Sequence, residues 1–381
     1  MDAHHSRHLN SRDRVNLGSF YTPREYVELV GEWLLRAGVG RATDVFLDPS
    51  CGSGAFLGLH APFPQCRFLA NDIDREATRG LQEQFPAAEI HNRNALLQVS
   101  RRAYGIRTDE RLIIVGNPPY NDRTSQINHK TKVAASASVD PALRTRDLGL
   151  SSLLAYDALQ AEFVAVLHPL SYLVKKANFQ AARRFFGNYQ LKEHLVFNSQ
   201  EFDNTSRVAG FPVIVACYQR TPNQGLTFEQ VRKIPFRTKE GRLFALEERD
   251  YLGDYIDKYP RRTVPQAPGQ LLFYTLRDVN ALRRSKTFLT KRTANAVLIK
   301  PEQLDYYCYA DCFKHYATPD YLLGNLDIPF LAKEFPAIAS DVRAVAMANH
   351  PEVFGGQPKA TEEQVKRVRA YLQKVTRLRL H

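Results

Sequence analysis

The first half of the chain alternates short apolar runs with segments of helical character. Apolar runs of four to eight residues between turn residues predict strands, and apolar residues that recur every three or four positions predict helices. Helical spacing is found in segments such as 75–84 and 170–186. Strands alternating with helices predict βαβ units and a largely parallel sheet. The expected strands are 44–47, 67–70, 112–115, 163–167, 194–197 and 213–218.

The pattern changes after Arg220. Residues 221–225 read TPNQG, a turn-rich break, and the segments beyond it are interrupted by proline and rich in aromatic residues and basic pairs. A last helix is expected from Thr361, because Thr361 and Gln364 fit a capping box. We therefore predict two domains, an α/β domain over 1–220 and an α+β or irregular domain over 221–381, with an approximate boundary.

Composition points to a soluble protein of the cytoplasm. Of the 381 residues 44% are hydrophobic, and no apolar stretch is long enough to span a membrane. The five cysteines are too few and too irregular for a disulfide framework. Cys308, Cys312 and His315 form a C-x3-C-x2-H pattern, but three ligands fall short of a closed tetrahedral zinc site. We expect buried structural cysteines there and predict no metal site.

Basic residues outnumber acidic ones. The chain has 52 Lys and Arg against 40 Asp and Glu, which gives a formal net charge of +12. Lysine and arginine bind phosphates with release of counterions, so this excess favours a polyanionic partner without proving one.

The first candidate site follows the strand expected at 44–47. Asp48 ends this strand, and the small-residue loop Pro49-Ser50-Cys51-Gly52-Ser53-Gly54 leads into an apolar segment. Glycines at 52 and 54 allow backbone N–H groups to approach a ligand closely. In open α/β sheets, ligands bind beyond the carboxyl ends of the strands. The loop differs from G-x-G-x-x-G, and no phosphate-binding G-K-[ST] is present.

A second acidic strand end follows 24 residues after Asp48. Asp72 lies in the sequence Asn-Asp-Ile-Asp. Its separation from the glycine loop along the chain is about that at which a carboxylate holds the hydroxyls of a ribose in dinucleotide-binding folds. Ile73 is suited to pack on an adenine face. Together the two strand ends predict an adenosine pocket.

The third strand end is Asn117-Pro118-Pro119-Tyr120. The two prolines carry no N–H, which leaves carbonyl groups free to accept hydrogen bonds. An exocyclic amine becomes nucleophilic when both its hydrogens are accepted. The Asn117 side-chain oxygen and the Pro118 carbonyl can accept them, and the Tyr120 ring can stack on a base.

In this order the motifs DPSCGSG, NDID and NPPY resemble those of S-adenosylmethionine-dependent amino-methyltransferases of nucleic acids. Residues 17–23, LGSFYTP, resemble the additional cofactor motif of the gamma class of adenine-N6 DNA methyltransferases, in which the target-recognition domain comes last. The resemblance covers residues 17–218. It implies a Rossmann-like methyltransferase sheet with helices on both faces, residues 1–220 as catalytic domain and 221–381 as DNA target-recognition domain. The cofactor residues it implies are Tyr21, Thr22, Pro23, Asp48, Pro49, Cys51, Gly52, Gly54, Asp72, Ile73 and Asn94.

Two positions need separate comment. The family usually has an acidic residue where this chain has Asn94, whose amide oxygen can still accept from the cofactor adenine. Family members also carry an aromatic residue that stacks on the flipped base. We assign this role to Phe202, with Phe211 as the alternative.

The predicted activity is site-specific DNA methylation at adenine N6, in a restriction-modification system. The target base is flipped out of the duplex between Tyr120 and Phe202, and the transfer is direct and requires no metal. The predicted partners are double-stranded DNA and a cognate restriction endonuclease. The alternatives are the same chemistry on RNA or on a protein glutamine, and a non-catalytic DNA-specificity subunit.

Overall fold

The computed structural model describes residues 22–120, 138–202, 210–247, 249–261, 263–356 and 358–377. They form two compact units. The first unit comprises described residues up to 202 together with 213–232 and 236–241, and the second comprises 210–212, 233–235 and those from 242 onward. The compact units thus divide near Gly241, and the assignment of a function to each half stays a prediction.

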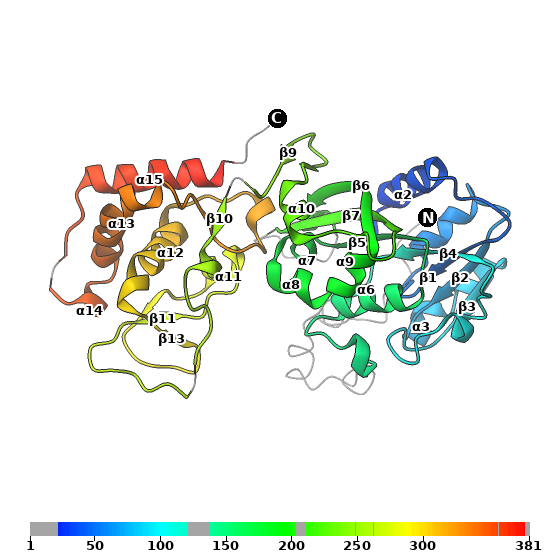
Figure 1. Ribbon diagram of the computed structural model, residues 1–381, viewed down its shortest axis with the longest axis horizontal. Helices are drawn as coiled ribbons and strands as arrows, with labels where there is room; N and C mark the ends of the chain where they lie inside the picture. The colour runs from blue at the N-terminus through cyan, green and yellow to red at the C-terminus, as the bar shows by residue number, and fades with distance from the viewer. Residues whose placement is uncertain are drawn as a thin grey trace. The chain divides into compact units, whose positions relative to one another are not determined.

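A seven-stranded mixed sheet forms the centre of the first unit (Figure 1). Its order is β3-β2-β1-β4-β5-β7-β6, with β1 to β5 parallel and β7 antiparallel to β5. All seven residues of β5 are buried, as expected for a strand covered on both faces. The strands are β1 (Asp44–Asp48), β2 (Arg67–Asn71), β3 (Ala88–His91), β4 (Arg111–Gly116), β5 (Phe163–Pro169), β6 (Tyr189–Asn198) and β7 (Pro212–Arg220).

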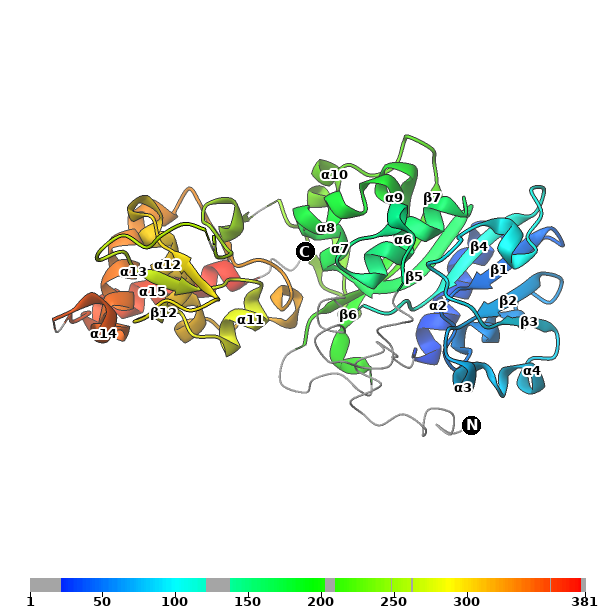
Figure 2. The same ribbon diagram turned by 90° about the horizontal axis from the view of Figure 1, so that it is seen from below.

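Helices cover both faces of this sheet, as Figures 1 and 2 show. The predicted α/β, Rossmann-like fold class is confirmed, and all six expected strands are present. The α-helices are α2 (Arg24–Arg36), α3 (Arg75–Thr78), α4 (Leu81–Gln84), α6 (Leu148–Ala158), α7 (Ser171–Val174), α8 (Lys176–Ala181), α9 (Arg183–Asn188) and α10 (Phe228–Lys233). Short 3₁₀ helices are η1 (Ala55–His60), η2 (Arg101–Tyr104), η4 (Pro141–Leu143) and η5 (Ser199–Glu201).

Two expected helices are interrupted. Residues 75–84 form α3 and α4, separated by Arg79 and Gly80, and 170–186 lie within three short helices, α7 to α9. Lys175 between α7 and α8 has an extended backbone (φ −90°, ψ 119°), which ends the first helix. The helical character of both segments is confirmed, and the interruptions were not predicted.

The second unit is α+β. Helix α12 (Leu304–Tyr316) packs on α13 (Phe335–Asn349), and α13 packs on α15 (Glu362–Thr376). The capping box at Thr361 and Gln364 is confirmed. A small antiparallel sheet has the order β12-β11-β13. The other elements are β8 (Phe236–Arg237), β9 (Leu243–Phe244), β10 (Asp250–Tyr251), β11 (Leu272–Tyr274), β12 (Phe288–Leu289), β13 (Ala296–Leu298), β14 (Pro329–Phe330), α11 (Val279–Arg284), α14 (Pro351–Phe354), η6 (Leu252–Asp254), η7 (Pro301–Gln303) and η8 (Tyr321–Leu323).

All five cysteines are buried free thiols. The expectation of structural cysteines at 308 and 312 is therefore confirmed. None of the helices in the described ranges has the length and apolar character needed to cross a membrane.

Candidate active site

The three sequence motifs lie at one edge of the sheet. Strands β1, β2 and β4 run parallel, with Leu47 paired to both Leu69 and Ile114, so their carboxyl ends point the same way. The strand order reverses direction at β1, because β2 and β3 extend to one side and β4 and β5 to the other. Such a switch point is where open α/β sheets bind ligands.

The glycine loop after β1 is held by the end of β2. The backbone N–H of Gly52 donates to Asp72 Oδ2 at 2.8 Å, and that of Cys51 donates to the Asn71 carbonyl at 2.8 Å. Gly52 and Gly54 both have positive φ, +49° and +80°. A Cβ at Gly54 would lie 2.8 Å from Leu81 Cδ2, whereas a Cβ at Gly52 would meet nothing within 4 Å. Gly54 is therefore required for packing, and Gly52 faces open space.

Asn71 joins three strand-end loops, a role that the sequence analysis missed. Its fully buried amide donates to the Pro49 carbonyl at 2.9 Å and the Arg93 carbonyl at 3.1 Å, and accepts from the Arg93 N–H at 3.1 Å. A polar residue at the last position of an otherwise apolar strand is the signal that could have identified it.

Two carboxylates at this edge are desolvated. Asp48 is 4% exposed, and its burial raises the pKa to about 8, with the charge of Asp72 adding to the effect. Burial also raises the pKa of Asp72. A Cβ at Gly116 (φ +151°) would lie 2.8 Å from Asp48 Oδ1, so a glycine there makes room for the carboxylate. Among the described residues, neither Asp48 nor Asp72 forms an ion pair with a basic side chain.

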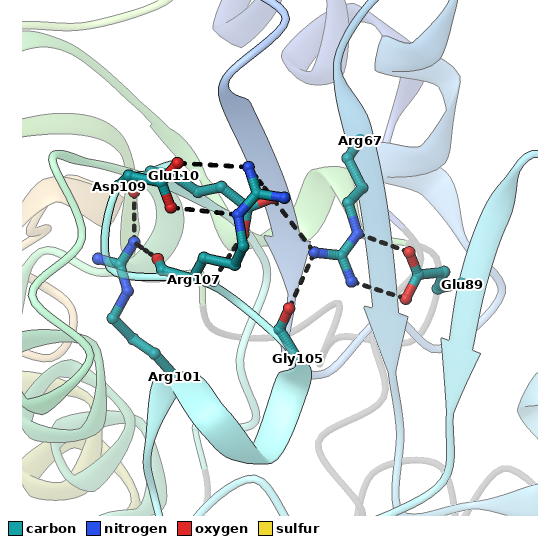
Figure 3. A network of polar contacts seen from close by, with 7 residues as sticks. All are labelled: Arg67, Glu89, Arg101, Gly105, Arg107, Asp109 and Glu110. Carbon is teal, nitrogen blue, oxygen red and sulfur yellow. Dashed lines mark hydrogen bonds and ion pairs between the residues drawn. The ribbon is translucent and has the colours of Figure 1, made fainter.

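The opposite edge of the sheet is different. There, at the amino ends of the strands, Arg67 of β2 pairs with Glu89 of β3 at 2.6 Å (Figure 3), and Arg111 of β4 pairs with Asp44 of β1 at 2.7 Å. Glu110 accepts from the Arg107 N–H at 2.6 Å in the same network. Acidic side chains at the amino edge are thus paired with arginines, whereas Asp48 and Asp72 at the carboxyl edge have no cationic partner within the described ranges, which suits a cationic ligand there.

The NPPY segment directly follows β4. Asn117 Nδ2 donates to Thr22 Oγ1 at 3.2 Å, and the Tyr120 hydroxyl donates to Asn117 Oδ1. Thr22 is buried, so the bond fixes which way the Asn117 amide faces. Pro118 is buried, and Asn117, Pro119 and Tyr120 are half-buried. The acceptor oxygen of Asn117 therefore points to the side on which Tyr120 lies.

Polar side chains of α6, α7, β5 and β7 form a separate hydrogen-bonded group. Asp147 caps α6 by accepting from the Gly149 N–H at 2.8 Å, and it also accepts from the Tyr172 hydroxyl. Tyr172 stacks on His168, whose Nε2 lies 2.8 Å from the Tyr218 hydroxyl. Burial lowers the pKa of His168 to about 4, so the ring is neutral at pH 7. None of these residues belongs to a recognisable motif.

The remaining predicted cofactor residues have distinct environments. Ile73 is 44% exposed, so its side chain is accessible to a flat ligand. Asn94 Oδ1 accepts from the Leu96 N–H at 2.9 Å, while its Nδ2 donates to the Ser138 carbonyl at 2.8 Å. The hydrogen bond from the cofactor adenine to Asn94 remains a prediction. Pro23 immediately precedes α2, and Tyr21 lies outside the described residues.

The two candidate base-stacking residues differ in burial. Phe202 is 2% exposed and packs edge-on against Phe197, with ring centroids 5.5 Å apart, and Phe197 stacks on Tyr26. Phe211 is half-buried and precedes β7. Residues 203–209 between them lie outside the described ranges.

Comparison with known proteins gave only structural similarities. No family model and no curated protein matches the chain. A Pyrococcus horikoshii protein assigned as an RNA methyltransferase aligns at 14% identity over 54% of this chain and 89% of its own, with a TM-score of 0.36. The type I restriction-modification methyltransferase subunit of Streptococcus thermophilus aligns at 16% over 53% and 45%, with a TM-score of 0.38. A TehB-like S-adenosylmethionine-dependent methyltransferase of Corynebacterium glutamicum aligns at 17% over 50% and 88%, with a TM-score of 0.30. Similarity at this level carries no argument about activity.

Proposed function

We propose that this chain is an S-adenosylmethionine-dependent methyltransferase that modifies the N6 amine of adenine in DNA. The observation that carries the proposal is the carboxyl edge of the sheet. Two desolvated carboxylates, neither paired with a basic side chain in the part of the chain that the structure describes, lie beside an open glycine loop, and strand β4 ends at an amide whose orientation is fixed.

The donor set fits the cofactor. S-adenosylmethionine carries positive charge on its ammonium and sulfonium groups, and it supplies the methyl group when bound. Asp48 and the loop through Gly52 and Gly54 would hold the amino-acid and sulfonium part. Asp72 would hold the ribose, and its carboxylate is itself positioned by hydrogen bonds from the backbone N–H groups of Gly52 and Asp74. Ile73 would pack on the adenine.

The NPPY segment would hold the acceptor amine. Asn117 Oδ1 and the Pro118 carbonyl accept the two amine hydrogens, which raises electron density on the nitrogen without ionising a side chain. The nitrogen would then form a bond to the methyl carbon as the bond between that carbon and the cofactor sulfur breaks, with the electron pair left on sulfur, and the nitrogen would lose one proton to solvent. Before this, the Tyr120 hydroxyl must release or share Asn117 Oδ1, to which it donates in the free protein. Transfer depends mainly on positioning.

The target base would be extrahelical, because its amine cannot be reached within the duplex. Tyr120 supplies one stacking face, and Phe202 or Phe211 supplies the other. As Phe202 is packed against Phe197, its side chain would have to rotate out of that contact to reach a base.

A basic segment of the second unit supports a nucleic-acid partner. Residues 258–300 contain ten Lys or Arg and one Asp. Five of these basic residues are exposed and form no ion pair with any described residue: Arg283, Arg284, Lys286, Lys291 and Arg292. Charges of this kind are available to phosphates, and binding should weaken steeply with salt. We assign DNA recognition to the second unit, with a cognate endonuclease as partner in a restriction-modification system.

The decisive experiment identifies the methylated product. The purified protein is incubated with S-adenosylmethionine and, separately, with plasmid DNA, total RNA or a protein extract, and the digested products are analysed by mass spectrometry. We expect N6-methyladenine in DNA, absent with Asn117→Ala. Methylated RNA or glutamine alone would assign the alternative acceptors. No transfer, together with retained DNA binding, would indicate a non-catalytic specificity subunit.

A further inference from the structure

Three potential metal ligands converge in the second unit. Asp311 and His315 lie one turn apart on α12, and His350 directly follows α13. One carboxylate oxygen and one ring nitrogen from each histidine all lie within 4.8 Å of one another. Asp311 Oδ1 is 2.7 Å from His350 Nε2 and 3.4 Å from His315 Nε2.

These distances suit a tetrahedral ion. Zinc bonds to nitrogen and oxygen of ~2.0–2.1 Å place neighbouring ligands about 3.3 Å apart, close to the 2.7 and 3.4 Å that separate Asp311 Oδ1 from the two histidine nitrogens. Two imidazoles and one carboxylate favour zinc and related transition ions over magnesium or calcium, which prefer oxygen ligands. The His315 side chain is 40% exposed, which leaves a route for the ion.

The surrounding contacts orient the ligands. His350 Nε2 faces Asp311 Oδ1 at 2.7 Å and Thr287 Oγ1 at 3.1 Å, while Nδ1 lies 3.1 Å from Glu352 Oε1. When an ion replaces the proton on Nε2, Nδ1–H can donate to the Glu352 carboxylate. Carboxylate–histidine–metal arrangements of this kind are usual at zinc sites. The other oxygen of Asp311 accepts from Asn349 Nδ2 at 3.0 Å, while Thr287 Oγ1 donates to Asp311 Oδ1 at 2.5 Å.

The cysteine pattern in the same helix does not contribute. Cys308 and Cys312 are fully buried, and Cys312 Sγ lies 3.5 Å from the Val342 carbonyl. The residues of the C-x3-C-x2-H pattern therefore lie on different faces of α12. His315 shares a face with Asp311 at i,i+4, whereas the two thiols face the core.

We propose that Asp311, His315 and His350 bind one zinc-class divalent ion, with water in the fourth position. The ion joins α12 to the end of α13 and stabilises the second unit. The site departs from the sequence-based expectation of no metal, and it is independent of the proposed methyl transfer.

The test uses the full-length chain without an affinity tag. His4, His5 and His8 are changed to Gln in the parent protein, because these clustered histidines could bind metal themselves. After chelator treatment, the protein is titrated with ZnCl₂ by calorimetry at pH 7.5, and thermal unfolding is followed with and without zinc. We expect one ion per chain and a higher unfolding temperature with zinc.

His315→Gln and His350→Gln should each weaken zinc binding at least tenfold and abolish the thermal shift. His315 is the most exposed of the three ligands, so its replacement leaves the core intact and keeps the test informative if other variants misfold. Cys312→Ser and His60→Gln, a change in the first unit, should retain both effects. Absence of zinc binding, or binding unchanged in the two histidine variants, would overturn the proposal.

Discussion

The two units bring their polar groups together in different ways. In the first unit, Gly52 and Asp72 meet because they follow adjacent parallel strands, β1 and β2. In the second unit, Asp311 and His350 meet because one helix packs on the end of another, 39 residues later. A parallel sheet places every strand-end loop at one edge, whereas helix packing brings together positions that no local pattern marks.

This difference predicts a division of labour. Cofactor binding and methyl transfer depend on strand-end loops of the first unit, and DNA affinity depends on exposed charge in the second. Variants of one unit should then change one property and leave the other intact.

The largest effect is expected from Asn117→Ala. Loss of a positioned polar group at a reacting centre costs ~10²–10³-fold in turnover, and we expect a loss of this order or more. Cofactor affinity and DNA affinity should change much less than turnover, because Asn117 is linked to the predicted cofactor residues only through its hydrogen bond to Thr22. Thr22→Val removes the acceptor for Asn117 Nδ2 and should cost less turnover, but it should also lower cofactor affinity, since Thr22 is itself a predicted cofactor residue. Single-turnover methylation measures the loss of turnover in both variants, and calorimetry measures their cofactor affinity. Near-normal turnover in Asn117→Ala would exclude the proposed role.

Asp72→Ala should weaken cofactor binding by ~1.5–3 kcal/mol, the usual cost of losing a hydrogen bond to a charged group. It also removes the acceptor for the Gly52 N–H, which contributes to the same loss. Asp74→Ala is the control, because Asp74 is a nearby carboxylate that caps α3. Calorimetric titration with S-adenosylmethionine measures the cofactor affinity of the Asp72→Ala and Asp74→Ala variants. Equal losses in both variants would mean that Asp72 has no specific role.

The sequence predicted most of the first unit and little of the second. The strand ends at Asp48, Asp72 and Asn117 lie at one edge as expected, because buried strands have strong apolar runs and loops with characteristic residues. Strand β3, with the pattern buried, exposed and two half-buried residues, was missed, since it carries no such run. Asn71 and Thr22 act through tertiary contacts that spacing alone does not encode. The Asp311 cluster depends on how α12 and α13 pack, so the local C-x3-C-x2-H pattern contains only one of its members, His315.

The two candidate base-stacking residues, Phe202 and Phe211, test the division of labour between the units, because Phe202 belongs to the first unit and Phe211 to the second. Stacking on a base is worth ~1–3 kcal/mol, so Phe202→Ala should slow methylation and reduce the fluorescence rise of 2-aminopurine at the target position. Phe202→Trp should restore much of both. Phe211→Ala should mainly lower stability. A flipping defect confined to a stably folded Phe211→Ala would exchange the roles and assign a base contact to the second unit.

Cofactor affinity should rise with pH through the Asp48 carboxyl. Burial raises its pKa to about 8, so in the free protein Asp48 is protonated below that pH and must lose a proton to pair with the cofactor ammonium. Affinity should increase by somewhat less than tenfold from about pH 6.5 to 7.5, the window in which the ammonium keeps its own proton. The free energy of unfolding of the ligand-free protein should fall as pH rises, because the folded state favours the protonated form of Asp48. This contribution to stability is lost as pH rises through about 8. Asp48→Asn should remove the pH dependence measured by calorimetry, and an unchanged profile would contradict the assignment.

The smallest effect is expected from single charges in the second unit. Arg283 and Arg284 end α11, are exposed, and form no ion pair with any residue that the structure describes. Each phosphate contact makes the plot of log binding constant against log salt concentration steeper, by about −0.9 in slope. Losing one contact should therefore weaken DNA binding about fivefold at 0.15 M salt. Arg283→Gln and Arg284→Gln should each show this loss, with a shallower salt slope and unchanged cofactor affinity. Lys192→Gln, an exposed charge on β6 of the first unit, is the control. Fluorescence anisotropy of labelled duplex DNA at several salt concentrations measures slope and affinity together. If Lys192→Gln reduces the slope and the arginine variants do not, the phosphates bind to the first unit. The proposal that DNA affinity depends on the second unit would then be wrong.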